Sequence, residues 1–218
     1  MNLKTLQKAI KILREYYRRF HPPSVTEVSE RYHDPYHVLL SCILSLRTKD
    51  ATTAQASSRL FALAPTLISL EKVPVKKIEK TIYPVGFYRT KAKNIKRIAE
   101  ELIGRFQGSV PDTLDGLLSL PGVGRKTANL VLTLGFNKLG ICVDTHVHRI
   151  SNRFGFVATK NPFETEMALR KRLPKRYWKE YNDLLVSFGQ NVCKPVSPFC
   201  SDCRIARYCP RIGVTHHR

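Results

Sequence analysis

Four cysteines close to the C-terminal end place the strongest constraint on what this chain can fold into. They follow the spacing C-x6-C-x2-C-x5-C within 17 residues, as Cys193, Cys200, Cys203 and Cys209. Thiolates this close in sequence are able to surround one metal centre, and prolines at 195 and 198 exclude a regular helix there. The residues alone leave structural zinc and an iron–sulfur cluster both open. The other two cysteines, Cys42 and Cys142, lie in apolar segments and are expected to be buried as small apolar side chains.

The charge balance of the chain points to a polyanionic partner. Its 37 Lys and Arg residues outnumber 17 Asp and Glu residues, for a formal net charge of +20. Nucleic acid is the first expectation, because each phosphate neutralised releases counterions and adds affinity. A merely soluble cationic protein and one attracted to anionic membranes are the alternatives. No apolar run approaches the roughly 20 residues of a membrane span. The N-terminal segment has no secretory signal, so we expect reduced thiols and a cytoplasmic protein, nucleoid-associated if prokaryotic.

Hydrophobic periodicity is helical almost throughout, and no run alternates with a period of two. The pattern predicts an all-α fold with helices over residues 2–20, 35–46, 51–63, 75–82, 90–106, 113–119, 125–136, 145–154, 162–173 and 177–192. Asp50 is predicted to cap the helix at 51–63, and Asp112 precedes the helix at 113–119 in the same way. The tail after residue 192 is predicted to be a loop held by its ligands.

The segment LPGVGRKTA at residues 120–128 joins two predicted helices. Gly122 and Gly124 allow a tight hairpin with open backbone amides, and Val123 between them is suited to plug the hairpin into the core. The helix that follows starts at Arg125, so its positive N-terminal end is directed at the same place. A lone G-x-G is common in plain interhelical turns, whereas this longer pattern predicts contact with phosphate.

Three motifs in this order resemble the endonuclease III family of iron–sulfur, helix–hairpin–helix DNA glycosylases. They are LPGVGRKTANLVL at 120–132, VDTHVHR at 143–149 and the cysteine tail, and YPVGFYRTKAKNI at 83–95 adds to them. The resemblance covers essentially the whole chain. It implies a six-helix barrel domain carrying the hairpin at residues 28–138, and a second domain of residues 1–27 and 139–218 around a [4Fe–4S] cluster. It also implies that duplex DNA with a damaged base or an abasic site binds in the cleft between them, with no membrane partner and with monomeric action.

The resemblance assigns the chemistry to Lys126 and Asp144. A lysine in the first helical turn after the hairpin is expected to have a lowered pKa, because the helix dipole and partial burial oppose its charge. In the family the matching lysine attacks C1′ of the damaged nucleotide as a Schiff-base nucleophile and then permits β-elimination. Asp144 is a candidate N-cap of the helix at 145–154, and the family places the matching carboxylate in the active-site cleft, where it assists proton transfer. The two roles are compatible.

The remaining DNA contacts follow the family with one departure. Arg47 stands where the family has a glutamine that fills the space left by the extruded nucleotide, so a wedge and a plain surface arginine are both open. His146 is expected to support the cleft, and Arg149 to contact phosphate or pair with an acid. The leading prediction is a bifunctional glycosylase and abasic-site lyase for oxidised or damaged pyrimidines. The alternatives are a uracil or thymine mismatch glycosylase on the same scaffold and a non-catalytic, metal-stabilised DNA-binding protein.

Overall fold

The computed structural model describes residues 1–20 and 22–218, and these form helices and loops without a strand. The predicted all-α class is therefore confirmed. By their contacts the residues divide into two compact units: a terminal unit, Met1–Pro23 with Leu139–Arg218, and a central unit, Ser24–Lys138. No helix in the described ranges is long and apolar enough to cross a bilayer.

The division begins four residues earlier than the sequence suggested. Residues 24–27, predicted to belong with the N-terminal segment, open a helix of the central unit, because Ser24, Val25 and Thr26 are buried there. His21, inside the predicted segment 1–27, lies outside the described residues.

The central unit is built around one fully buried helix, α3 (Pro35–Ser45). Every residue from Tyr36 to Leu44 is buried, and Asp34 caps the helix by accepting from the amides of Tyr36 and His37. A helix that is apolar on all sides needs neighbours all round. Those that pack on α3 are α2 (Ser24–Tyr32), α4 (Asp50–Leu63), α7 (Tyr88–Phe106), α9 (Arg125–Leu130) and a π-helical turn at Val131–Gly135. The unit is completed by α5 (Leu67–Glu71), α6 (Val75–Ile82) and α8 (Leu114–Leu118).

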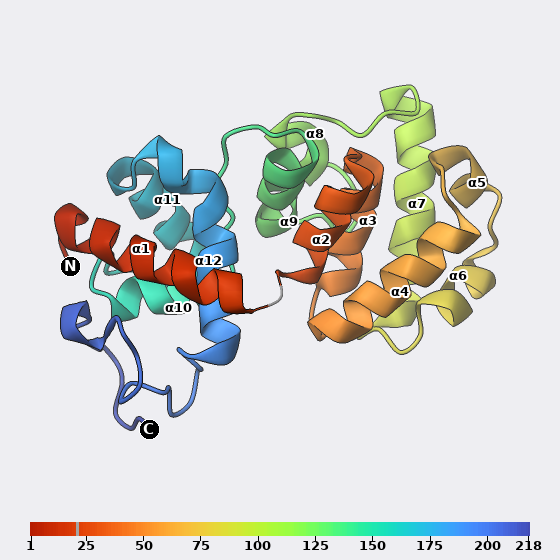
Figure 1. The fold of residues 1–218 in the computed structure, drawn as a ribbon. Helices are drawn as coiled ribbons and strands as arrows, with labels where there is room; N and C mark the ends of the chain where they lie inside the picture. Colours follow the sequence, from red (N-terminus) through yellow and green to blue (C-terminus); the bar gives the residue numbers. More distant parts are fainter. Residues whose placement is uncertain (21) are drawn as a thin grey trace. The chain divides into compact units, whose positions relative to one another are not determined.

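The terminal unit brings the two ends of the chain together. Its helices are α1 (Leu3–Arg19), α10 (Thr145–Arg153), α11 (Pro162–Arg172) and α12 (Trp178–Asn191), and α1 crosses and packs against α12 (Figure 1). Leu6, Ile10 and Leu13 form one buried stripe of α1 in a core shared with Phe188 of α12. Ile205, from the cysteine-rich tail, is fully buried in the same core. The tail itself contains one short 3₁₀ turn, at Ala206–Tyr208.

The predicted helices are present, with differences at their ends. The helix predicted at 125–136 changes after Leu130 into a π-helical turn, and α2 and α5 were not predicted. Both missed helices are short, and α2 follows two prolines, so neither shows a sustained period.

The prediction that Asp50 caps α4 is wrong. Asp50 is the first residue of that helix, and its carboxylate accepts a hydrogen bond from the Ser24 hydroxyl of α2 at 3.1 Å. At α8 the cap is Thr113 rather than Asp112, because the Thr113 hydroxyl accepts from the amide of Gly116 while Asp112 pairs with Lys138.

Candidate active site and metal centre

The segment between α8 and α9 forms a tight hairpin whose shape is fixed by its packing. Gly122 has a φ of +77°, and a Cβ at this position would lie 2.5 Å from Nδ2 of Asn94 on α7. Only glycine avoids both the backbone strain and the contact. Val123 is 6% exposed and plugs the hairpin into the central unit, as the sequence predicted. Gly124 then begins α9 without any side-chain hydrogen bond at the cap, so the hairpin presents backbone at the start of that helix.

Lys126 is the second residue of α9 and is half-buried. The helix places it beside Cys42, a fully buried thiol of α3. Burial raises the pKa of Cys42 to about 12, and the positive charge of Lys126 acts in the opposite direction. Lys126 therefore lies between the packed surface of α3 and the hairpin, which is an unusual setting for an amine that would otherwise be fully hydrated. The predicted burial of Cys42 is confirmed.

Arg47 lies in the short connection between α3 and α4. Its φ is +50°, a conformation that is uncommon for a residue with a side chain, and the residue is exposed. The guanidinium carbon lies 5.5 Å from the centre of the Phe87 ring, which is a cation–π contact. Phe87 is itself 62% exposed and has a φ of +58°. Two strained residues thus present a cationic and an aromatic side chain next to one another on the central unit.

Asp144 caps α10 in the terminal unit, as predicted. Its Oδ1 accepts a hydrogen bond from the amide of Val147 at 2.8 Å, and its backbone is extended. The side chain is half-buried, so a second carboxylate oxygen can act on a proton while the first holds the helix. The capping hydrogen bond fixes the position of the carboxylate and leaves its second oxygen available.

His146 and Arg149 lie on α10 against α12. The Arg149 guanidinium donates to the carbonyl of Cys193 at 2.8 Å and contacts His146 Nδ1 at 3.1 Å. A Cβ at Gly189 of α12 would overlap the His146 ring, so glycine is required for this packing. Burial lowers the pKa of Arg149, and its Nε is a buried donor with no partner among the described residues. Both side chains support the junction of α10 and α12, and contact of either with DNA stays a prediction.

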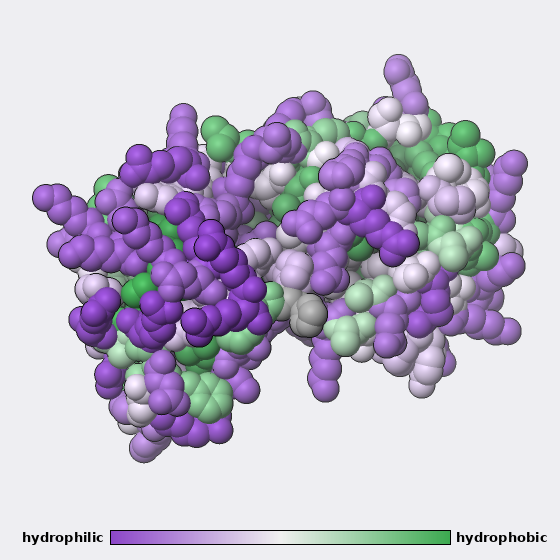
Figure 2. Space-filling model, in the orientation of Figure 1, coloured by the Kyte–Doolittle hydropathy of each residue, from purple (hydrophilic) through white to green (hydrophobic). Residues whose placement is uncertain are grey.

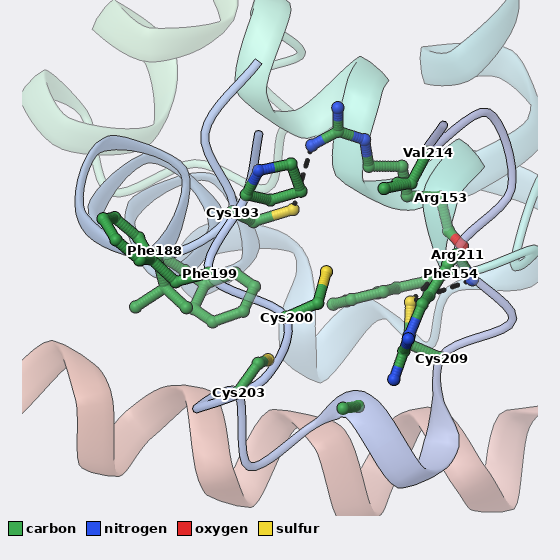
Figure 3. A pocket seen from close by; sticks show the side chains of 13 residues that line it. Arg153, Phe154, Phe188, Cys193, Phe199, Cys200, Cys203, Cys209, Arg211 and Val214 are labelled. Carbon is green, nitrogen blue, oxygen red and sulfur yellow. Dashed lines mark hydrogen bonds between the residues drawn. The ribbon is translucent and has the colours of Figure 1, made fainter. Parts of the chain in front are cut away.

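The four tail cysteines line one pocket of the terminal unit. Figure 3 shows their sulfur atoms around a common space that is walled by Phe154, Phe188 and Phe199. Arg153 of α10 closes one side, donating to Cys193 Sγ at 3.3 Å and to the carbonyls of Lys194 and Pro195 at 2.7 Å each. The predicted convergence of the four cysteines is therefore present in the fold. The other cysteine, Cys142, is buried at 2% exposure, as predicted.

The donor set of this pocket is four thiols, which fits a metal centre with thiolate ligands. Among the described residues, no three Cys, His or acidic side chains lie close enough together to hold one metal ion. Burial raises the pKa of Cys200, of Cys209 and, to about 11, of Cys203. A positive metal charge beside these thiols would favour their ionised form.

Two functional side chains were missed in the sequence. Lys91 and Arg153 are buried at 5% and 8% exposure, although both are basic. Lys91 falls within the basic run at residues 89–97, for which the sequence leaves a solvated helix face and a DNA-binding stripe both open. Its burial could have been predicted from its place on the helix, because Lys91 lies on the same face as the buried residues Ala92, Ile95 and Ile98 of α7. Arg153 likewise follows Ile150 at helical spacing.

The surface carries the positive charge that the composition indicates. Hydrophilic side chains dominate the visible face of the terminal unit around α1 and α11 (Figure 2). Exposed basic residues of α1, of the end of α11 and of the start of α12 contribute, together with two between these last helices, namely Lys4, Lys8, Lys11, Arg18, Arg19, Lys171, Arg172, Lys175, Arg176 and Lys179. Such a surface is typical of proteins that bind a polyanion.

Comparison with known proteins decides the family. A model described as "HhH-GPD superfamily base excision DNA repair protein" matches residues 40–175. Endonuclease III of Thermotoga maritima is 48% identical over 176 residues, covering 81% of this chain and 83% of the relative. The chain belongs to the endonuclease III family. The resemblance seen in its sequence motifs is thereby confirmed.

Two solved structures extend the similarity to the whole endonuclease III fold. A non-covalent endonuclease III–DNA complex superimposes with a TM-score of 0.82 at 35% identity, covering 94% of this chain and 95% of the other. A trapped endonuclease III–DNA covalent intermediate, described as an estranged-adenine complex, gives a TM-score of 0.80 at 33% identity with the same coverage. A chloroplastic homologue from Arabidopsis thaliana is longer, and the chain spans 48% of its length at 46% identity.

Proposed function

We propose that Lys126 carries the reaction of a bifunctional DNA glycosylase that removes oxidised or damaged pyrimidines from duplex DNA. Within the endonuclease III family the chain is a DNA N-glycosylase and an abasic-site lyase of base-excision repair. The observation that carries the assignment is a half-buried lysine in the first turn of the helix that follows the hairpin. A covalent enzyme–DNA intermediate has been trapped for a structural relative, which requires a nucleophile of this kind.

The geometry supports the following steps at Lys126. The unprotonated amine of Lys126 carries the lone pair that acts as the nucleophile. That lone pair bonds to C1′ of the extruded nucleotide while the bond from C1′ to the base breaks, and the base leaves with the electron pair. Loss of a proton from nitrogen and opening of the sugar ring give an imine. Removal of a proton from C2′ then expels the 3′ phosphate and cuts the strand.

We assign Asp144 to proton transfer and charge stabilisation in the same reaction. Its Oδ1 is held by the Val147 amide, so the carboxylate keeps one orientation throughout turnover. A fixed negative charge stabilises cationic character developing at the sugar as the base departs.

DNA binding is divided between backbone and side chains. The hairpin at Gly122, Val123 and Gly124, followed by Arg125, offers open backbone and a cation to a phosphate. Arg47 is proposed to fill the space of the extruded nucleotide, since it is exposed, held in a strained backbone and backed by an aromatic ring. The net charge of +20 supplies the remaining, sequence-independent attraction.

A [4Fe–4S] cluster held by Cys193, Cys200, Cys203 and Cys209 is proposed as the metal centre. When bound, it would supply bonds that join Cys193, which closely follows α12, to the three cysteines of a loop with little secondary structure. We also propose that the protein acts as a monomer, in the cytoplasm with the nucleoid if its host is a prokaryote, because its substrate is genomic DNA.

Borohydride trapping on an abasic duplex tests the assignment of Lys126. The wild-type protein should be captured covalently, and Lys126→Ala should lose at least about 10³-fold in trapping and strand cutting, since no other group replaces the amine. Lys77→Ala, an exposed lysine of α6, is the matched control and should trap normally. Normal trapping by Lys126→Ala would remove Lys126 from its role. Parallel duplexes with thymine glycol or uracil distinguish the oxidised-pyrimidine enzyme from a mismatch glycosylase.

A further inference from the structure

Lys91 is a buried charge in the central unit for which the reaction has no direct use. It lies in the first turn of α7 and is 5% exposed. Its Nζ donates to the carbonyl of Leu44 at 2.8 Å, to the carbonyl of Leu46 at 2.5 Å and to the hydroxyl of Thr48 at 3.1 Å. An ammonium group has three donors, and all three are used. Within the described part of the chain no carboxylate pairs with it.

These three acceptors lie on either side of Arg47. Leu44 and Leu46 form the end of α3, where unpaired carbonyls carry the negative end of the helix dipole. The Thr48 hydroxyl donates to the Leu46 carbonyl at 3.2 Å and accepts from the amide of Gly86 at 3.2 Å. Lys91 and Thr48 therefore clamp the backbone immediately before and after Arg47.

The segment before α7 closes the clamp from the other side. A Cβ on Gly86 would lie 2.5 Å from the carbonyl oxygen of Arg47, so the two backbones meet only because residue 86 is glycine. The next residue, Phe87, places its ring under the Arg47 guanidinium. Arg47 is therefore held through the carbonyls of its neighbours, through the close packing of its own backbone against Gly86 and through its side chain, while the residue stays exposed.

The arrangement is costly, which argues that it serves a purpose. A non-glycine residue at positive φ is strained and persists only where its surroundings impose it. Burial lowers the pKa of Lys91 to about 8, so desolvation acts against the charge that the three acceptors need. An apolar side chain would continue the stripe of Ile95 and Ile98 without that penalty. A methionine there would fill the space but remove all three hydrogen bonds of the ammonium group, and only the neutral hydrogen bonds of Thr48 and the packing of Gly86 and Phe87 would still hold Arg47.

We propose that Lys91 is a positioning residue for Arg47, holding residues 44–48 in the one conformation that presents the guanidinium to the space left by an extruded nucleotide. The inference rests on the proposed function, in which Arg47 is the wedge. Lys91 acts through Arg47 and touches neither the sugar nor the base. It sets how readily the duplex is opened, which is separate from the chemistry at Lys126.

A double-mutant cycle tests the coupling. Lys91→Met, Arg47→Ala and the double variant are compared in single-turnover excision of thymine glycol, with a fluorescent base analogue beside the lesion to report extrusion. Each single variant should slow extrusion and excision by about tenfold, the size expected when one charge-assisted hydrogen-bonded element is lost. The double variant should be no slower than either single one, because both remove the same step. Cutting at a preformed abasic site, where no base must be unstacked, should fall by less than about threefold.

Lys96→Met is the matched control. Lys96 lies on the same helix but donates to the Glu71 backbone carbonyl and not to residues 44–48. Its loss should therefore leave extrusion unchanged. Losses that multiply in the double variant, or wild-type excision by a folded Lys91→Met protein, would overturn the inference. If Lys91→Met does not fold, Thr48→Val removes the second half of the clamp and must give the same non-additivity with Arg47→Ala. An inactive wild-type protein on abasic DNA would sink the proposed function instead.

Discussion

The hairpin of the central unit and the cysteine loop of the terminal unit are held in two different ways. The hairpin takes its shape from packing: Gly122 adopts a left-handed conformation against Asn94, and Val123 is buried beneath it. The cysteine loop, residues 193–209, has one short 3₁₀ turn and four partly buried thiols around a pocket. Ile205 is fully buried in the hydrophobic core, and Cys193, Cys203, Tyr208 and Cys209 pack against that core while partly exposed.

The polypeptide alone fixes the conformation of the hairpin, whereas the conformation of the cysteine loop also depends on a bound group. The hairpin needs no ligand, since every constraint on it comes from side chains and backbone of the same unit. The loop has thiols whose pKa values are raised by burial, and mutual proximity disfavours a second ionised sulfur. A bound metal charge would stabilise the ionised thiols, and each of the four could then form a bond to the metal centre. The two regions should therefore respond differently to mutation.

The largest effect is expected from removing one ligand. Cys203→Ala should lose bound iron and expose residues 193–218 to proteolysis, because metal-coupled folding contributes on the order of 10 kcal/mol in small sites. Iron content, absorbance near 400 nm and the pattern of limited proteolysis are the measurements. The central unit, Ser24–Lys138, should stay resistant.

The control for this variant is Cys142→Ala, which removes the same atom from a buried site of the same unit. It should keep its iron and lose only about 1 kcal/mol, the value of a small core deletion. If Cys203→Ala retained stoichiometric iron and a protected loop, the comparison between the two regions would fail.

Sequence patterns predicted the helices because these leave local signals, whereas the roles of Lys126 and Asp144 were predicted from the family resemblance. Asp144 was recognised as a cap because an aspartate immediately before an amphipathic segment has one common use, and its bond to the Val147 amide confirms it. The same rule was wrong at Asp50, because the hydroxyl of Ser24, distant in sequence, takes its carboxylate. Long-range partners of this kind leave no trace in a local pattern.

The environment of Arg47 illustrates the limit more clearly. Its position was found by resemblance, but neither its positive φ nor the clamp formed by Lys91 and Gly86 could be derived from the sequence. Two segments, residues 44–48 and 86–91, lie some 40 residues apart in the sequence and must pack together before these contacts exist. A basic run on a helix indicates a solvated face until the buried face is known.

The second prediction concerns the region held by packing. Gly122→Ala should lower the free energy of unfolding by about 1–3 kcal/mol, because alanine meets both the left-handed backbone and the Asn94 side chain. Duplex binding should weaken with it, since the hairpin backbone shifts. Chemical denaturation followed by helical circular dichroism, with binding measured by fluorescence anisotropy, gives both values. Iron content should be unchanged.

A second glycine provides the comparison. Gly104 lies within α7, where an added Cβ would meet nothing within 4 Å and the φ is not positive. Gly104→Ala should therefore stabilise the protein by about 0.5–1 kcal/mol. Equal effects of the two substitutions would show that the hairpin is not held by packing. If the double variant Gly122→Ala/Asn94→Ala recovers duplex binding, the loss in Gly122→Ala comes from the contact with Asn94. If it does not, the loss comes from backbone strain at residue 122.

The smallest change in stability, and the most informative about chemistry, is expected at Asp144. Asp144→Asn keeps an oxygen that accepts from the Val147 amide, so stability should change by less than about 0.5 kcal/mol, whereas Asp144→Ala should lose about 1 kcal/mol with the cap. Both variants should lose turnover and keep duplex affinity, because both remove the charge. Single-turnover excision and thermal unfolding separate the two roles.

Asn161 is the matched control, because it caps a helix of the same unit and has no proposed role in the reaction. Its side chain accepts from the amide of Glu164 at 2.9 Å at the start of α11, so Asn161→Ala should cost as much stability as Asp144→Ala and leave excision at the wild-type rate. If Asp144→Asn excised as fast as the wild-type protein, Asp144 would be a cap and nothing more. Its carboxylate would then belong with the residues that the fold needs, and the base would have to leave with Lys126 and the DNA contacts alone to assist it.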